Sequence, residues 1–208
     1  MLVAHIHDAL DKVRKLQEII LSRRFFQGYS GKARIAGGIA ALAGSLILSR
    51  DFVPATPQAH FIGWMIVLSV ALAINYGALL NWIVTEPKVR QHPVILKPAL
   101  DALPGLVLGG ILTLVFWRAG LFDLLFGAWM CCFAVAHMAY RQSLPGENYF
   151  VGIFYLVCGA ACLLVPGIRF TSPWPMGLVF FAGELAGGCI LIVMNDREND
   201  LEKLDNED

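Results

Sequence analysis

The chain has 208 residues, of which 57% are hydrophobic and 15% are charged, and its formal net charge is zero. This composition, with a mean hydropathy of +0.64, excludes an ordinary water-soluble domain, because a domain of this size could not cover so much apolar surface in water. Lipid is therefore the expected solvent for much of the chain.

The first element expected in chain order is a cytoplasmic amphipathic helix within residues 1–31. Apolar side chains recur there at spacings of four, three, three and four residues, which is the helical period. These side chains are Ile6, Leu10, Val13, Leu16 and Ile20. Three roles stay open for this helix. It could lie on the inner leaflet, pair with its copy in a second subunit, or pack beneath its own bundle.

Residues 32–194 are expected to form a bundle of six transmembrane helices. The apolar runs that predict them cover residues 33–48, 61–84, 98–117, 121–140, 149–165 and 174–194. They should all be helices because unpaired backbone amides are costly in lipid. The expected fold class is an all-α membrane protein with the six helices arranged as three antiparallel hairpins. An acidic cytoplasmic tail, residues 195–208, follows the bundle.

The Lys and Arg residues predict the orientation of this bundle. Thirteen of the sixteen lie before or at the very start of the first apolar run, in alternate loops or in the tail, and the other three are Arg50, Arg118 and Arg169. Loops rich in Lys and Arg stay on the cytoplasmic side. Both termini are therefore expected to be cytoplasmic, in a bacterial-type inner (plasma) membrane. The first span is expected to be an uncleaved anchor rather than a signal peptide.

Small residues predict how the helices pack. Glycines spaced four residues apart allow close approach of two helices in lipid. The clearest pairs are Gly105 with Gly109 and Gly183 with Gly187. The odd-numbered spans are all rich in small residues, and each is followed by a returning helix, which favours three related hairpins.

This layout resembles the HdeD-like small bacterial membrane proteins, which are associated with acid stress. The resemblance is carried by the stretches GGILTLVF (109–116), LLFGAWM (124–130), LVCGAACLLVPG (156–167) and GLVFFAGELAGG (177–188). It implies a stress-related role in the membrane without implying a known reaction. The charged N-terminal segment and the acidic tail depart from that family's compact form.

Polar residues inside the spans carry whatever chemistry the bundle has. Glu184 is near the middle of the last apolar run, about 15 Å from its start at 1.5 Å per residue. Without a cationic neighbour, the cost of burying a charge favours its neutral form. Asn75, His137 and Asp101 are expected to form an inner polar cluster. A proton or cation path from this cluster to Glu184 is one hypothesis, and hydrogen bonds that join helices are the other.

No catalytic residue, metal site or cofactor is expected. The five cysteines all lie within apolar runs, where they behave as small apolar residues. Cys158 and Cys162 share a helix face, but no His or carboxylate is near them in sequence. His137 and His60 are at opposite ends of their spans, which disfavours the paired His that a transmembrane haem needs.

The expected function is therefore that of a non-enzymatic integral membrane protein, structural, regulatory or stress-related. It would act through helix packing and through association with a second copy or another membrane protein. The alternative is a small proton- or solute-translocating protein that uses Glu184. The expected partners are the lipid bilayer and these proteins, and no nucleic acid.

The orientation predicts the outcome of cysteine-accessibility labelling in intact cells. Cysteines introduced within residues 1–30 or 195–208 should react only after the inner side is exposed, because the basic loops hold both termini there. A cysteine replacing Asp51 is the control and should react from outside. Reaction of either terminus from outside would contradict the orientation.

Overall fold

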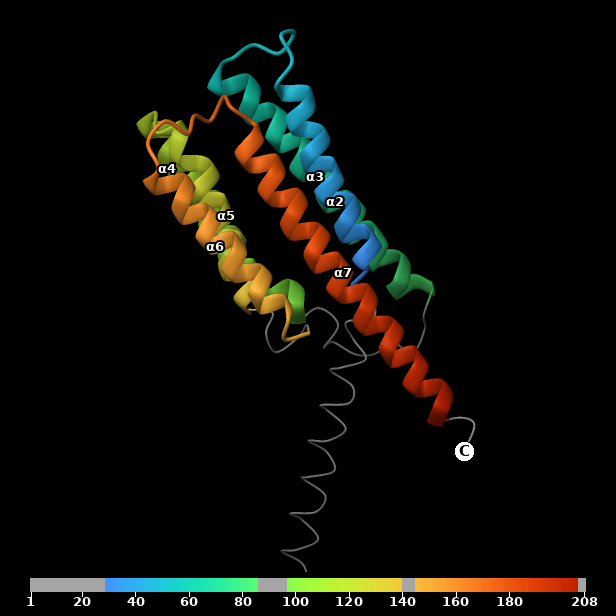
Figure 1. Ribbon diagram of the computed structural model, residues 1–208. Helices are drawn as coiled ribbons and strands as arrows, with labels where there is room; N and C mark the ends of the chain where they lie inside the picture. The colour runs from blue at the N-terminus through green and yellow to red at the C-terminus, as the bar shows by residue number, and fades with distance from the viewer. Residues whose placement is uncertain (1–28, 86–96, 140–144, 206–208) are drawn as a thin grey trace, which may run out of the picture.

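The computed structural model describes residues 29–85, 97–139 and 145–205 (Figure 1). Within these ranges every regular element is a helix, and no strand occurs. The elements are α2 (Gly31–Leu48), α3 (Pro57–Thr85), α4 (Lys97–Ala119), the 3₁₀-helix η3 (Phe122–Leu124), α5 (Leu125–Ala139), α6 (Asn148–Leu164) and α7 (Trp174–Asp205). The amphipathic helix expected at Ile6, Leu10, Val13, Leu16 and Ile20 lies outside the described residues.

Five of the described helices are long and apolar enough to cross a membrane. The sixth, α6, is also apolar but has 17 residues. An all-helical architecture with several membrane-length helices confirms the all-α part of the expected fold class. The observed helices follow the apolar runs of the sequence, since each run is long enough to span lipid only as a helix.

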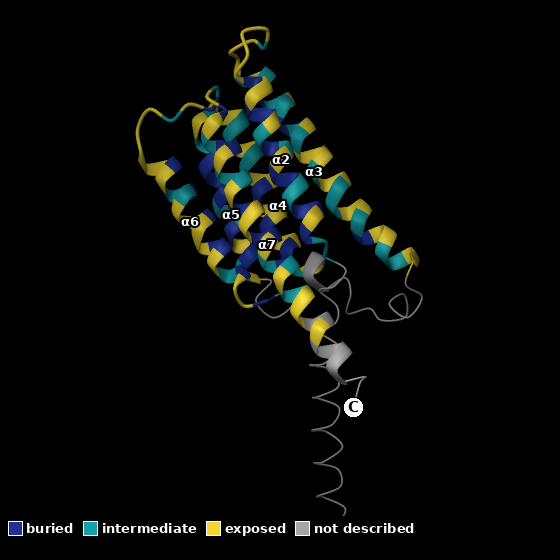
Figure 2. Cartoon of the chain, turned by 45° about the vertical axis from the view of Figure 1, so that its right-hand side comes forward, coloured by how far each residue is buried: buried dark blue, intermediate teal, exposed yellow. Residues whose placement is uncertain are grey.

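The helices form two groups of three that lie side by side (Figures 1 and 2). In one group α2 packs along both α7 and α3, and in the other α5 packs along both α4 and α6. Contacts between α6 and α7 join the two groups. Most residues of α3 are at least partly exposed, and its buried residues are His60, Trp64 and Leu79.

The contact between α2 and α7 is close because glycines face each other across it. A Cβ atom added at Gly188 would lie 2.6 Å from the carbonyl oxygen of Gly31. A Cβ atom added at Gly38 would lie 3.3 Å from the carbonyl oxygen of Phe181. Small residues at such positions let the two backbones approach and gain van der Waals contact in lipid.

The turn between α4 and η3 is tight. Gly120 has a φ of +72°, a conformation that glycine adopts without the strain of a side chain. The amide of Leu121 donates to the carbonyl oxygen of Phe116 at 2.9 Å, and the amide of Gly120 donates to that of Trp117 at 3.2 Å. These two bonds form a Schellman motif, which ends α4 and reverses the chain.

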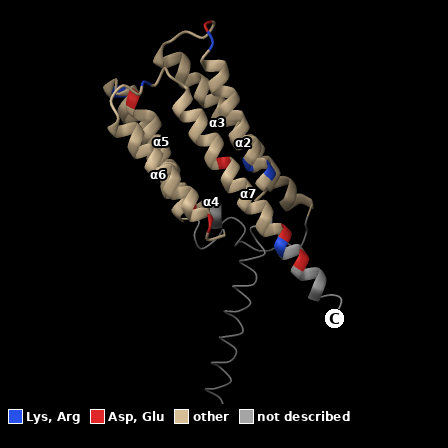
Figure 3. Ribbon diagram, viewed as in Figure 1, with Lys and Arg blue, Asp and Glu red and all other residues tan. Residues whose placement is uncertain are grey.

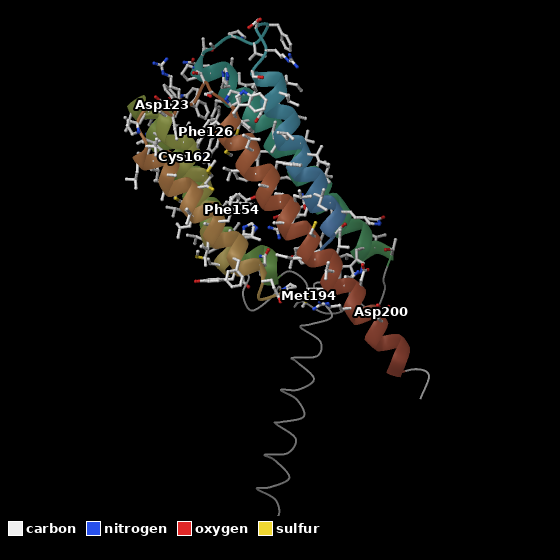
Figure 4. The ribbon with its side chains drawn as sticks, viewed as in Figure 1. Asp123, Phe126, Phe154, Cys162, Met194 and Asp200 are labelled. Carbon is white, nitrogen blue, oxygen red and sulfur yellow. The ribbon has the colours of Figure 1, made fainter. Side chains whose placement is uncertain are left out.

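The end of the bundle with residues 49–56, 120–124 and 165–173 is called the loop end, and it is uppermost in Figure 1. Asp123 lies there, and its Oδ1 accepts a hydrogen bond of 2.7 Å from the amide of Phe170 (Figure 4). This bond ties the loop before α7 to η3. The opposite end, where α7 continues past Met194, is called the tail end.

Gly105 and Gly109 face α5, as a helix-packing role requires. A Cβ atom added at Gly105 would lie 2.9 Å from the carbonyl oxygen of Cys132, and one added at Gly109 would lie 3.5 Å from the Cys132 Cβ. Gly110 differs from both, because nothing lies within 4 Å of an added Cβ there.

This difference predicts opposite results for two alanine substitutions in α4. Gly105→Ala should lower the free energy of unfolding by about 1–3 kcal/mol, since the new methyl group forces α4 and α5 apart. Gly110→Ala is the matched control and should be neutral or stabilising by up to about 1 kcal/mol through helix propensity. Thermal unfolding in detergent measures both. Equal effects of the two changes would contradict the packing of α4 on α5.

Candidate functional site

A buried ion pair joins α2 to α7. Arg34 is in the first turn of α2 and is 7% exposed, and Glu184 is part-way along α7 and is 9% exposed. The Arg34 Nε donates to Glu184 Oε2 at 2.8 Å, and Nη2 lies 3.4 Å from Oε1. In Figure 3 most charged residues lie near the helix ends, and an acidic segment interrupts the uncharged course of α7. The bundle thus holds a charge pair away from water.

Three more side chains complete a network around this pair. The Tyr155 hydroxyl donates to Glu184 Oε1 at 2.9 Å, and Arg34 Nη1 donates to Asn148 Oδ1 at 2.7 Å. The Arg34 Nη2 also donates to the Nε2 of His137. We call Arg34, His137, Asn148, Tyr155 and Glu184 the buried polar network. It draws on α2, α5, α6 and α7, and therefore links the two groups of helices.

The partners of His137 determine where its proton lies. A guanidinium can only donate, so the Nε2 that meets Arg34 must be the acceptor. The Nδ1 is 3.0 Å from the carbonyl oxygen of Phe133, which can only accept, so the proton is on Nδ1. His137 is thus neutral in this arrangement. Its Nε2 is 3.9 Å from Glu184 Oε1, beyond a hydrogen bond.

Glycines of α7 make the space that the network occupies. A Cβ atom added at Gly187 would overlap the guanidinium of Arg34, and one added at Gly183 would overlap the ring of Tyr155. Gly183 and Gly187 flank Glu184 on one face of the helix because residues four apart lie one turn apart. The structure therefore places both glycines against side chains of the network. The sequence predicted that this pair of glycines packs against a neighbouring helix, and the contacts observed are with side chains of α2 and α6.

The electrostatics of the site differ from the expectation for an isolated carboxyl. The neutral form of Glu184 was expected in the absence of a cation, and Arg34 is that cation. A guanidinium stays protonated in proteins, so a buried Arg needs an anion beside it. Glu184 is that anion, and its two oxygens accept hydrogen bonds from Arg34 and Tyr155. The arrangement can hold four helices in one register.

The other polar candidates do not join the network. The Asn75 side chain donates to the backbone carbonyl oxygens of Ala71 at 2.9 Å and Ala33 at 3.5 Å, so it ties α3 to α2. Asp101 lies in α4 and is partly exposed. Asn75, His137 and Asp101 were expected to form an inner cluster. Of these three residues, the structure places His137 in the network beside Glu184.

Sequence reasoning overlooked three members of the network. Arg34 was counted with the cytoplasmic basic residues, although its place between the small residues Ala33 and Gly37 was a signal that it could enter the bundle. Asn148 and Tyr155 share a helix face two turns apart, but nothing local distinguishes them from residues at a membrane surface.

Two sulfur atoms contact each other within the bundle. Cys162 Sγ is 3.9 Å from Met130 Sδ in the seam between α5 and α6. No group of three or more His, Cys, Asp or Glu side chains suited to a metal ion occurs in the described part of the chain. The geometry of the site is accordingly that of an ion pair with hydrogen-bonded neighbours.

Comparison with protein-family models, with curated proteins and with solved structures gives no match. The HdeD-like resemblance therefore stays a prediction.

The ion pair predicts a strong coupling between its two members. Arg34→Met or Glu184→Met alone should lower the free energy of unfolding by about 3–5 kcal/mol, because each leaves the other charge buried and unpaired. The double variant should lose much less than the sum of the two single losses, since no charge remains. Thermal unfolding in detergent gives all three values. Additive losses would show that the two residues do not interact.

Proposed function

We propose that this chain is a non-enzymatic structural or regulatory protein of a bacterial-type inner membrane, in which the buried polar network holds the bundle in one arrangement. It would work through contacts with a second copy or with another membrane protein. The observation that carries this proposal is the engagement of Glu184, whose carboxylate accepts hydrogen bonds from Arg34 and Tyr155.

The engagement of Glu184 bears on mechanism in a simple way. A proton-carrying carboxyl must alternate between its charged and neutral forms, and the free energies of the two forms within the membrane must be similar. Protonation of Glu184 would remove the anion beside Arg34 and leave a cation unpaired in a buried place, which costs several kcal/mol. A fixed ion pair therefore favours a structural role for this carboxylate over a proton-carrying one.

The proposal includes six spans arranged as three antiparallel hairpins, with both termini cytoplasmic. The helix α6, Asn148–Leu164, is the short member, and 17 residues correspond to about 26 Å at 1.5 Å per residue. This is at the lower limit for crossing a bilayer, where flanking residues and local thinning compensate. The contacts of α2 with α3 and of α4 with α5 support two of the hairpins.

Association is the second part of the proposal. Large apolar side chains are exposed along α3 and α4, among them Ile62, Ile66, Leu100 and Leu114. These faces suit lipid tails and equally suit the helices of a neighbour. We propose that the amphipathic segment of residues 1–31 takes part in this association, as its apolar spacing suggests. The stress-related role implied by the HdeD-like resemblance fits a protein of this kind.

Proton- or solute-linked translocation is the alternative function. The observation in its favour is that three titratable side chains, His137, Glu184 and Tyr155, belong to one hydrogen-bonded network, in which the guanidinium of Arg34 joins His137 to Glu184. Such chains can relay protons when their members change partners. The hydrogen bonds that Arg34 donates to Glu184, Asn148 and His137 favour the structural role.

Proton flux into liposomes distinguishes the two functions. The wild-type chain reconstituted with a pH-sensitive dye inside should give no more flux than empty liposomes, because the ion pair is fixed. The Arg34→Met, Glu184→Met double variant removes the titratable carboxyl without stranding a charge, and it serves as the matched control. Flux in the wild type that disappears in the folded double variant would establish translocation and overturn the proposal.

A further inference from the structure

Two polar atoms of α3 are buried near the loop end without a protein partner. They are the Nε2 of His60 and the Nε1 of Trp64. His60 is 1% exposed and Trp64 is 3% exposed. A buried polar atom without a hydrogen bond costs about 1–3 kcal/mol, so two of them call for a physical explanation.

The two atoms are on one face of α3, because residues four apart lie one turn apart. The indole of a helical Trp extends over the preceding turn, which brings the Trp64 side chain toward His60. The two unsatisfied atoms therefore belong to neighbouring turns on one face of the helix.

The hydrogen bond at the other ring nitrogen of His60 determines what such a group must be. The His60 Nδ1 is 3.1 Å from the carbonyl oxygen of Thr56, which can only accept, so Nδ1 carries the proton. In a neutral imidazole with its proton on Nδ1, the Nε2 is an acceptor, whereas the Nε1–H of Trp64 is always a donor. A group that fits both must donate one hydrogen bond and accept another. A hydroxyl group does both.

The surroundings favour a neutral group. Trp64 packs edge-on against Phe126 with ring centroids 5.8 Å apart, and Phe126 packs against Phe170 at 4.8 Å. Within the described residues the recorded ion pairs, Arg34 and His137 with Glu184, involve neither His60 nor Trp64. A charged ligand would lack a counter-ion beside these rings, whereas a hydroxyl group needs none.

Another tryptophan of the same aromatic region shows how such a donor is usually satisfied. The Nε1 of Trp129 donates to the Oγ1 of Thr113 at 2.8 Å. A hydroxyl oxygen of the chain therefore meets the Trp129 donor, while the Trp64 donor has no counterpart of this kind.

We propose that His60 and Trp64 form a binding site for one hydroxyl group at the loop end of the bundle. The hydroxyl donates to His60 Nε2 and accepts from Trp64 Nε1. Its source is either a buried water molecule or a lipid-soluble phenol or quinol that enters from the membrane. This site is separate from the buried polar network and does not depend on the proposed function.

The test uses the full-length chain in lipid nanodiscs with ¹⁵N-labelled tryptophan. Trp64→Phe assigns the Trp64 indole signal, and Trp129, whose donor meets Thr113, is the internal control. We expect the Trp64 indole proton to show a cross-peak to a hydroxyl proton that does not belong to the chain, and the Trp129 indole proton to show a hydroxyl cross-peak to Thr113 alone. His60→Phe, which keeps a ring but removes the acceptor, should abolish that cross-peak.

The source is identified by the shift of the hydroxyl proton and by mass spectrometry of an organic extract. A cross-peak at the water frequency supports the site with water as its occupant. An equimolar phenol or quinol in the wild-type extract, absent from the His60→Phe extract, supports the site with a lipid-soluble occupant. If His60→Phe does not fold, His60→Gln replaces it and should shift the Trp64 signal. The proposal would be overturned if the wild-type Trp64 indole proton showed no hydroxyl cross-peak and the wild-type extract contained no phenol or quinol.

Discussion

The charge of Arg34 constrains the rest of this bundle. A guanidinium cannot give up its proton in a protein, so once α2 lies against α7 its charge must meet an anion. Glu184 supplies that anion at 2.8 Å, and the remaining donors of Arg34 reach Asn148 and His137. The three acceptors lie on three different helices, so a shift of α2 by one turn would break all of these hydrogen bonds together. The ion pair thereby sets the register of α2, α5, α6 and α7.

The two ends of the bundle are held together by different physics. The tail-end half contains the buried polar network, where directional hydrogen bonds decide which residues meet. The loop-end half contains aromatic rings, among them Phe126 and Phe170, which pack without such strict partners. His60 and Trp64 lie in this second half and bring polar atoms into it.

Glycine has two distinct tasks here, and the sequence does not distinguish them. Gly105 lets α4 approach the backbone of α5, whereas Gly187 leaves room for the guanidinium of Arg34. Both sit in a pattern of small residues four apart, which predicts helix packing in each case. The difference lies in what the opposite helix presents: the backbone of Cys132 in one case and a long polar side chain in the other.

The sequence by itself determined the all-helical class and the bounds of most helices, because the length of an apolar run is a local property. It also identified Glu184 and His137 as polar residues within the spans. Only the tertiary structure decided that Arg34 meets Glu184, since the two are 150 residues apart and nothing local specifies the contact. Local patterns record how far a segment prefers lipid to water. They do not specify which helix faces which. Because α2 packs against α7, Arg34 is the buried partner of Glu184 and not a surface charge.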